Sequence, residues 1–187
     1  MAVLGNMQRA LIRGALGLML LLGAASAAEA PTEFQVKAVF LFNFSRFVEW
    51  PPQAFSAADQ PFGVCILGDD PFGSRLDDAV RGEQIAQHPL SVRRLHSVGD
   101  SRGCQILYIA ASEAGQVRQI PAALEHRGVL TVSDINGAAE AGVMIQFTTE
   151  NNRIRLRINV DAARAAGLII SSKLLRPADI VGSAARD

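Results

Sequence analysis

The order of apolar runs and helix signals along the chain limits its fold more than any other feature. Four short runs are rich in aliphatic side chains, which is typical of strands inside a sheet, and they span residues 62–67, 88–96, 105–110 and 129–132. After the first run, Asp70 is a candidate N-cap, Pro71 suits the first helical turn and Gly82 is a stop signal. After the third run, Ser112 and Gly128 are the corresponding start and stop signals. This alternation predicts a mostly parallel sheet with helices on its faces.

The end of the sheet follows a different pattern. Residues 143–149 and 153–160 are strand-like and flank Asn151 and Asn152, whose side chains tolerate the positive φ of a tight hairpin. A short helix capped at Ser133 is expected between the fourth strand and this hairpin. Together the patterns predict a single α/β domain. It is a sandwich whose mixed, mostly parallel sheet is flanked by helices and has a C-terminal antiparallel hairpin.

An aromatic segment precedes the first strand. Residues 34–52, FQVKAVFLFNFSRFVEWPP, hold five of the nine phenylalanines and the only tryptophan. On a helix, one face carries most of the large apolar side chains, namely Val36, Phe40, Phe44 and Phe47. Val39 and Phe42 fall in the polar sector, whereas Lys37 falls in the apolar one. The segment is therefore either a central core helix or a helix that also contacts a second protein chain through Val39, Phe42 or Trp50.

The first residues have the features of an export signal. Arg9 and Arg13 precede an apolar run, and residues 25–27 are the small side chains that a signal peptidase accepts. We expect residues 1–27 to be a cleaved signal peptide and residues 28–187 to form the exported domain. Without the two leader arginines the formal net charge falls from 0 to about −2, which argues against nucleic acid as a partner.

Cys65 and Cys104 are the two cysteines, and both lie at strand-like runs. In an exported protein an even pair favours a disulfide. The alternative is a free nucleophilic thiol, which has no evident histidine partner.

One stretch matches a catalytic pattern without its context. Residues 99–103, GDSRG, read G-x-S-x-G, but a strand rather than a helix is expected after Ser101, and no Asp separates Ser101 from His126. The three histidines lack neighbouring ligands at metal-binding spacing. We therefore expect no enzymatic activity, no metal and no cofactor.

Arginines alternate along the last strand of the hairpin. Arg153, Arg155 and Arg157 share one face of this strand. They form either a solvated face or a site for a carboxylate, a phosphate or an acidic partner surface, because guanidinium groups bind such groups bidentately. Lys173 is a candidate extension of the patch.

Several of these stretches together resemble a known family. They are FQVKAVFLFNFSRFVEWP, GVCILGDDPFG, CQILYIAASE, VLTVSD and RLRINVDAARAAGLIISSKLLRPA, and they are similar to the YfiR family of small exported bacterial proteins. The resemblance implies periplasmic repression of an inner-membrane diguanylate cyclase, relieved when an outer-membrane, peptidoglycan-binding lipoprotein captures the repressor. It also implies a homodimer and a disulfide between Cys65 and Cys104. The second cysteine pair of some members is missing here.

Two functional hypotheses follow. The first is a regulator without catalytic activity that binds the sensor domain of the cyclase and limits cyclic di-GMP signalling and biofilm formation. Its partner-binding residues are expected to be Phe42, Phe44 and Trp50 for apolar contacts and Arg93 and Arg94 for charged contacts at the rim. The alternative is a periplasmic module that binds a small anion or a nucleotide on the arginine face.

Overall fold

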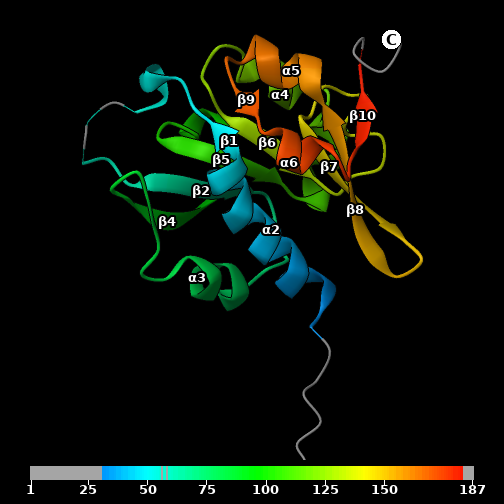
Figure 1. Ribbon diagram of the computed structural model, residues 1–187, viewed down its shortest axis with the longest axis horizontal. Coiled ribbons are helices and arrows are strands. Elements are labelled where there is room, and N and C mark those ends of the chain that lie inside the picture. The colour runs from blue at the N-terminus through cyan, green and yellow to red at the C-terminus, as the bar shows by residue number, and fades with distance from the viewer. Residues whose placement is uncertain (1–30, 56, 58, 183–187) are drawn as a thin grey trace, which may run out of the picture. The chain divides into compact units, whose positions relative to one another are not determined.

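The computed structural model describes residues 31–55, 57 and 59–182. The predicted signal peptide, residues 1–27, lies outside the described residues. An eight-stranded sheet has the order β10-β8-β7-β6-β5-β2-β4-β3 (Figure 1). Its strands are β2 (Phe62–Leu67), β3 (Gln84–Ile85), β4 (His88–Leu95), β5 (Cys104–Ile109), β6 (Leu130–Ser133), β7 (Ile145–Glu150), β8 (Arg153–Asn159) and β10 (Asp179–Val181).

The predicted fold class is confirmed. Strand β2 pairs in parallel with β4 and β5, and the parallel arrangement continues through β6 to β7. Strands β7 and β8 form the antiparallel hairpin, in which Asn151 and Asn152 both adopt positive φ. Strand β5 is the third parallel strand along the chain yet lies next to β2, so the chain reverses its direction of progress across the sheet after β4. The most apolar runs therefore occupy the centre of the sheet.

Helices and turns cover both faces of the sheet. The helices are α2 (Glu33–Phe47), α3 (Ser74–Val80), α4 (Gln119–Ala123), α5 (Val160–Ala165) and α6 (Ser172–Leu175). One face packs on α2, α3, α5 and α6 and includes the fully buried rings of Phe44, Phe62, Phe72 and Tyr108. The other face packs on α4 and the turns that follow β6, through Ile120, Leu124, Ala138 and Val143. Within the described residues, no helix is both long and apolar enough to span a bilayer.

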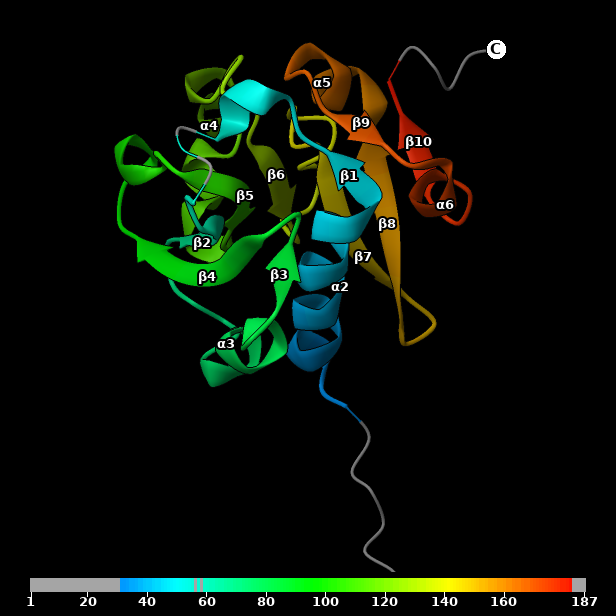
Figure 2. The same ribbon diagram turned by 60° about the vertical axis from the view of Figure 1, so that its left-hand side comes forward.

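A second, two-stranded sheet joins the two ends of the described chain. Strand β1 (Val48–Glu49) follows α2 directly and pairs antiparallel with β9 (Ile169–Ile170). Both lie against the end of α2, which crosses the sheet (Figure 2). Because the backbone leaves the helix to make this pairing, α2 ends at Phe47 rather than at the prolines that follow Trp50.

Several expected elements differ from the observed ones. Helix α3 begins at Ser74, because the Asp70 carboxylate accepts hydrogen bonds from the N–H groups of Phe72 and Gly73 and forms a tight turn instead of the helix cap. The helix expected after Ser133 is a series of turns; the Ser133 hydroxyl accepts from the N–H of Ile135 and donates to the carbonyl of Ile109 in the neighbouring strand. The helix expected after Ser112 is replaced by a 3-10 helix, Ala111–Gln116, and the short α4.

Candidate partner-binding surface

Helix α2 buries a stripe shifted by about one residue from the predicted face. Thr32 and Gln35 form a reciprocal capping box that fixes its start. The buried side chains recur every three or four positions, as on one face of a helix, and they are Lys37, Ala38, Leu41, Phe44 and Ser45. The opposite stripe, here called the outer stripe of α2, consists of Gln35, Val39, Phe42, Asn43 and Arg46. These five residues are exposed or half-buried.

Two apolar side chains interrupt the outer stripe. Val39 is 51% exposed and is one of two large exposed hydrophobic residues in the described part of the chain. Phe42 is half-buried, and the Arg46 guanidinium lies 4.6 Å from the centre of its ring. Arg46 in turn pairs with Glu83 at 3.1 Å. Aromatic residues and arginine are enriched at protein interfaces, and Phe42 and Arg46 provide both beside the exposed Val39.

A groove runs beside this stripe, between α2 and α3. Its volume is about 570 Å³, and its lining is formed by Pro31, Gln35, Val36, Val39, Arg75, Asp78 and Ala79. Sequence reasoning placed Val39 correctly in the polar sector but missed the wall that α3 supplies, because the contact between the two helices is tertiary. The available signal was the valine itself, an apolar residue among polar neighbours on one helix face.

The two aromatic residues predicted beside Phe42 have different positions. Phe44 is fully buried, and its ring stacks on Phe147 with a centroid distance of 5.9 Å, so it belongs to the core and does not reach the surface of this chain. Trp50 is half-buried. Its indole N–H donates to the carbonyl of Gln105 at 3.1 Å, and its ring meets Phe62 edge-on at 4.9 Å. Only part of the Trp50 ring is therefore available to a partner.

Arg93 and Arg94 lie on opposite faces of β4, because neighbouring residues of a strand alternate. Arg93 donates to the carbonyls of Arg102 at 2.7 Å and Asp100 at 3.0 Å. Arg94 binds two carboxylates of the α3 region: Asp70 at 3.0 Å and Asp77. The Arg94 guanidinium lowers the pKa of the Asp77 carboxyl below its ordinary value, mainly through the hydrogen bond. The two arginines thus serve two separate surfaces.

The ion pairs of Lys37 explain why a lysine lies in the apolar sector of α2. Its ammonium is 3% exposed and bridges Glu33 at 2.6 Å and Asp134 at 2.7 Å, and it lies 4.7 Å from the centre of the Phe34 ring. The phenol of Tyr108 is buried nearby. Burial, followed by the negative charge of Asp134, raises its pKa above the ordinary value. The amino-terminal end of α2 is therefore fixed to the end of β6 by a buried cation.

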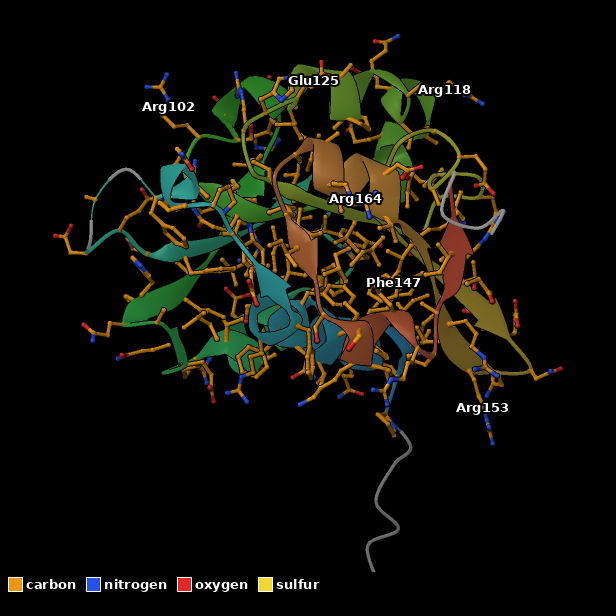
Figure 3. All side chains as sticks on the ribbon, turned by 45° about the horizontal axis from the view of Figure 1, so that its top comes forward. Arg102, Arg118, Glu125, Phe147, Arg153 and Arg164 are labelled. Carbon is orange, nitrogen blue, oxygen red and sulfur yellow. A yellow bond between two sulfur atoms is a disulfide. The ribbon has the colours of Figure 1, made fainter. Side chains whose placement is uncertain are left out.

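The arginine face of β8 is partly neutralised. Arg157 pairs with Glu140 at 2.6 Å, whereas Arg153 and Arg155 are exposed and form no ion pair with a described residue. Figure 3 shows Arg153 near the tip of the hairpin, away from the body of the sheet. Lys173 is not part of this face. Its neighbour Leu174 packs in the core cluster on the opposite side of β8 from the arginines.

Cys65 and Cys104 form the expected disulfide, with Cα atoms 5.8 Å apart. Among the described residues, no group of three or more His, Cys, Asp or Glu side chains is arranged to hold a metal ion.

Comparisons with known proteins place the chain in a family. No curated protein matches it. A family profile described as YfiR/HmsC-like matches residues 34–179, which include all of α2 except its first residue and every strand of the large sheet except the last two residues of β10. Members of this family are periplasmic regulators of diguanylate cyclase signalling. Since the match spans most of the chain, the protein belongs to the YfiR/HmsC-like family.

Proposed function

We propose that this protein is a regulator without enzymatic activity that binds the periplasmic sensor domain of an inner-membrane diguanylate cyclase and represses it. The family match over residues 34–179 is the observation that carries this proposal. Repression lowers cyclic di-GMP and limits biofilm formation. The contact uses the outer stripe of α2, with Val39 and Phe42 at its centre and the groove beside α3 as the receiving surface.

The chemistry of the outer stripe supports this assignment. Val39 can lose its exposed surface on binding without leaving a polar group unsatisfied. Phe42 and Arg46 are already packed together, so little side-chain entropy is lost when a partner covers them. Trp50 contributes the exposed part of its ring at the end of the same segment. Phe44 supports the surface from within the core.

Repression needs no catalytic residue. A ligand shifts an equilibrium between two states only by the difference in its affinity for them. To move the cyclase from 99% active to 99% inactive, the repressor must bind the inactive state more tightly than the active state by about 5.5 kcal/mol. A repressor that contacts one arrangement of the sensor domain and not the other supplies such a difference.

Relief of repression follows from competition for the same surface. An outer-membrane, peptidoglycan-binding lipoprotein that covers the outer stripe of α2 removes the repressor from the cyclase. A homodimer that uses the same groove would compete in the same way.

The test combines capture with a cellular measurement. The sensor domain of a candidate cyclase is immobilised, and the exported protein is applied as wild type, Val39→Asp or Ala123→Asp. Val39→Asp places a charge on the outer stripe, and exposed surface substitutions change stability by only about 0.5 kcal/mol. Ala123→Asp is the matched control, since Ala123 is exposed on α4 across the sheet.

We expect Val39→Asp to weaken capture at least tenfold and to raise cellular cyclic di-GMP, whereas Ala123→Asp matches wild type. If Val39→Asp binds and represses like wild type, the outer stripe is not the contact surface. If the wild-type protein neither captures the sensor domain nor lowers cyclic di-GMP, the proposed function itself fails.

A further inference from the structure

A polar hollow of about 390 Å³ lies at the amino-terminal edge of the parallel strands. It is formed by the loop before β5, the turn before β6 and the segment that follows β1. Its lining residues are Gln53, Ala54, Gln60, Gly99, Ser101, Arg102, Gly103, Cys104, His126, Arg127 and Val129. None of these residues belongs to the outer stripe of α2, so the hollow and the outer stripe are separate surfaces.

The ionisable side chains that line the hollow are all basic. Arg102, Arg127 and His126 are exposed, and no Asp or Glu occurs among the residues that form the wall. Neither arginine makes an ion pair with a described carboxylate, whereas His126 lies 3.8 Å from Glu125 just outside the hollow. Arg102 and Glu125 are both seen at this end of the molecule (Figure 3). Two unpaired guanidinium groups beside a concave polar wall favour a bound anion.

Ser101 provides a second, independent observation. The residue is 2% exposed, and its hydroxyl oxygen has no hydrogen-bond partner among the described residues. A buried hydroxyl without a partner costs about 1–3 kcal/mol, and such groups in native proteins call for a bound molecule or a functional role. This serine is the central residue of the G-x-S-x-G stretch, whose catalytic interpretation fails because strand β5 begins at Cys104.

The wall around Ser101 is rigid. The N–H of Ser101 donates to Val98, and the N–H of Cys104 donates to the Ser101 carbonyl at 3.0 Å. Arg93 fixes the same loop through the carbonyls of Asp100 and Arg102, and Cys104 is held by its disulfide. A preformed wall loses little entropy when a ligand binds.

We propose that this hollow binds a small organic anion, whose carboxylate or phosphate is held by Arg102 and Arg127 and whose hydroxyl groups bind Gln53 and Ser101. No Phe, Tyr or Trp ring occurs among the described lining residues, and the planar groups that line the hollow are the His126 imidazole and the two guanidinium groups. The volume suits a molecule of the size of a sugar acid or a sugar phosphate. The inference is independent of the proposed function, because it rests on other residues.

The experiment uses the protein purified from the periplasm and isothermal titration at one fixed ionic strength. D-Glucuronate tests a carboxylate, D-glucose 6-phosphate tests a phosphate, and D-glucose is the neutral control of the same shape. We expect saturable binding of at least one charged probe and no binding of glucose. If neither charged probe binds, or if glucose binds equally well, the proposal is overturned.

Variants then locate the site. Arg127→Gln and Arg102→Gln should each weaken binding of the charged probe at least tenfold, and Arg118→Gln, an exposed arginine outside the hollow, should leave it unchanged. Ser101→Ala should weaken binding while the melting temperature of the free protein stays equal or rises. Equal losses in all three arginine variants would indicate nonspecific attraction. A marked loss of stability in free Ser101→Ala would show that the hydroxyl serves the fold; either result refutes the assignment.

Discussion

Replacing Lys37 by methionine removes one buried charge and keeps all but the last atom of the side chain's length. Two unit charges about 4 Å apart interact by about 4 kcal/mol at the effective dielectric constant of a protein surface, before desolvation is counted. Loss of one partner of a buried pair costs about 3–5 kcal/mol, because the other charge stays behind. Glu33 is 49% exposed and Asp134 is 18% exposed. When the lysine charge is removed, water can therefore solvate the Glu33 carboxylate almost completely, but the Asp134 carboxylate only in part.

We therefore expect Lys37→Met to lower the free energy of unfolding by about 2–3 kcal/mol, which corresponds to a fall in melting temperature of about 4–12 °C for a domain of this size. Urea unfolding followed by circular dichroism, with the disulfide intact, measures it. Glu33→Gln should cost less than about 1 kcal/mol, since an exposed pair contributes little.

A double-mutant cycle isolates the contact itself. In Lys37→Met/Asp134→Asn neither charge remains, so the double variant should be more stable than the sum of the single changes predicts, by about 1–2 kcal/mol. If Lys37→Met unfolds within about 0.5 kcal/mol of wild type, or if the two changes are additive, the buried cation does not hold α2 on the sheet and this argument is wrong.

Three further outcomes test other contacts. The Arg94 guanidinium lowers the Asp77 pKa below 3.8, so the stability from this pair is full above that pH and is lost as the pH falls through the lower pKa of the folded state. The stability difference between wild type and Arg94→Gln should therefore shrink as the pH falls below 3.8, and a constant difference contradicts this. Tyr108 is the only tyrosine, and its pKa is raised above 10.0. Its phenol should therefore keep its proton past pH 10.0 in the folded protein, and the free energy of unfolding should fall as the pH rises further. Phenolate absorbance that appears at the ordinary pKa in the folded protein refutes this. Replacing both Cys65 and Cys104, which lie 39 residues apart, by alanine should lower the free energy of unfolding by about 4 kcal/mol, and a loss under about 1 kcal/mol would mean that the unfolded chain is already restricted.

The parts of the fold that local sequence determines could be predicted from it. Strand β2 occupies the expected residues 62–67 because an unbroken apolar run has no stable place except inside the sheet. The hairpin turn at Asn151 and Asn152 follows from the tolerance of asparagine for positive φ. The strict alternation along β8 places the arginines on one face, and Leu156 and Ile158 on the other face are buried in the core.

The elements that were missed depend on partners far along the chain. Strands β3 and β10 are short edge strands without an apolar run, and their pairing with β4 and β8 defines them. Helix α2 ends early because of its pairing with Ile169–Ile170. Lys37 is buried because Asp134, 97 residues away, neutralises it. Local patterns in a single sequence do not predict such contacts between residues far apart in the chain.

The candidate site shows the same division. Helical periodicity correctly placed Val39 and Phe42 on the outer side of α2, since the 3.6-residue repeat decides which residues share a face. Arg93 and Arg94 were predicted together as charged residues at the rim of one contact surface, whereas strand geometry puts them on opposite faces. The polar hollow could not be predicted, because three loops distant in sequence form it.

The pairing of β1 with β9 has a consequence for how this protein matures. A chain that crosses a membrane with its amino terminus first delivers Val48–Glu49 early and Ile169–Ile170 near the end. Until the second segment arrives, strand β1 has no partner strand, and the apolar side chains near the end of α2 stay open to chaperones and to other newly exported chains. Closure of the molecule is therefore tied to completion of transport, and truncation before Ile169 should yield an aggregating product rather than a smaller working one.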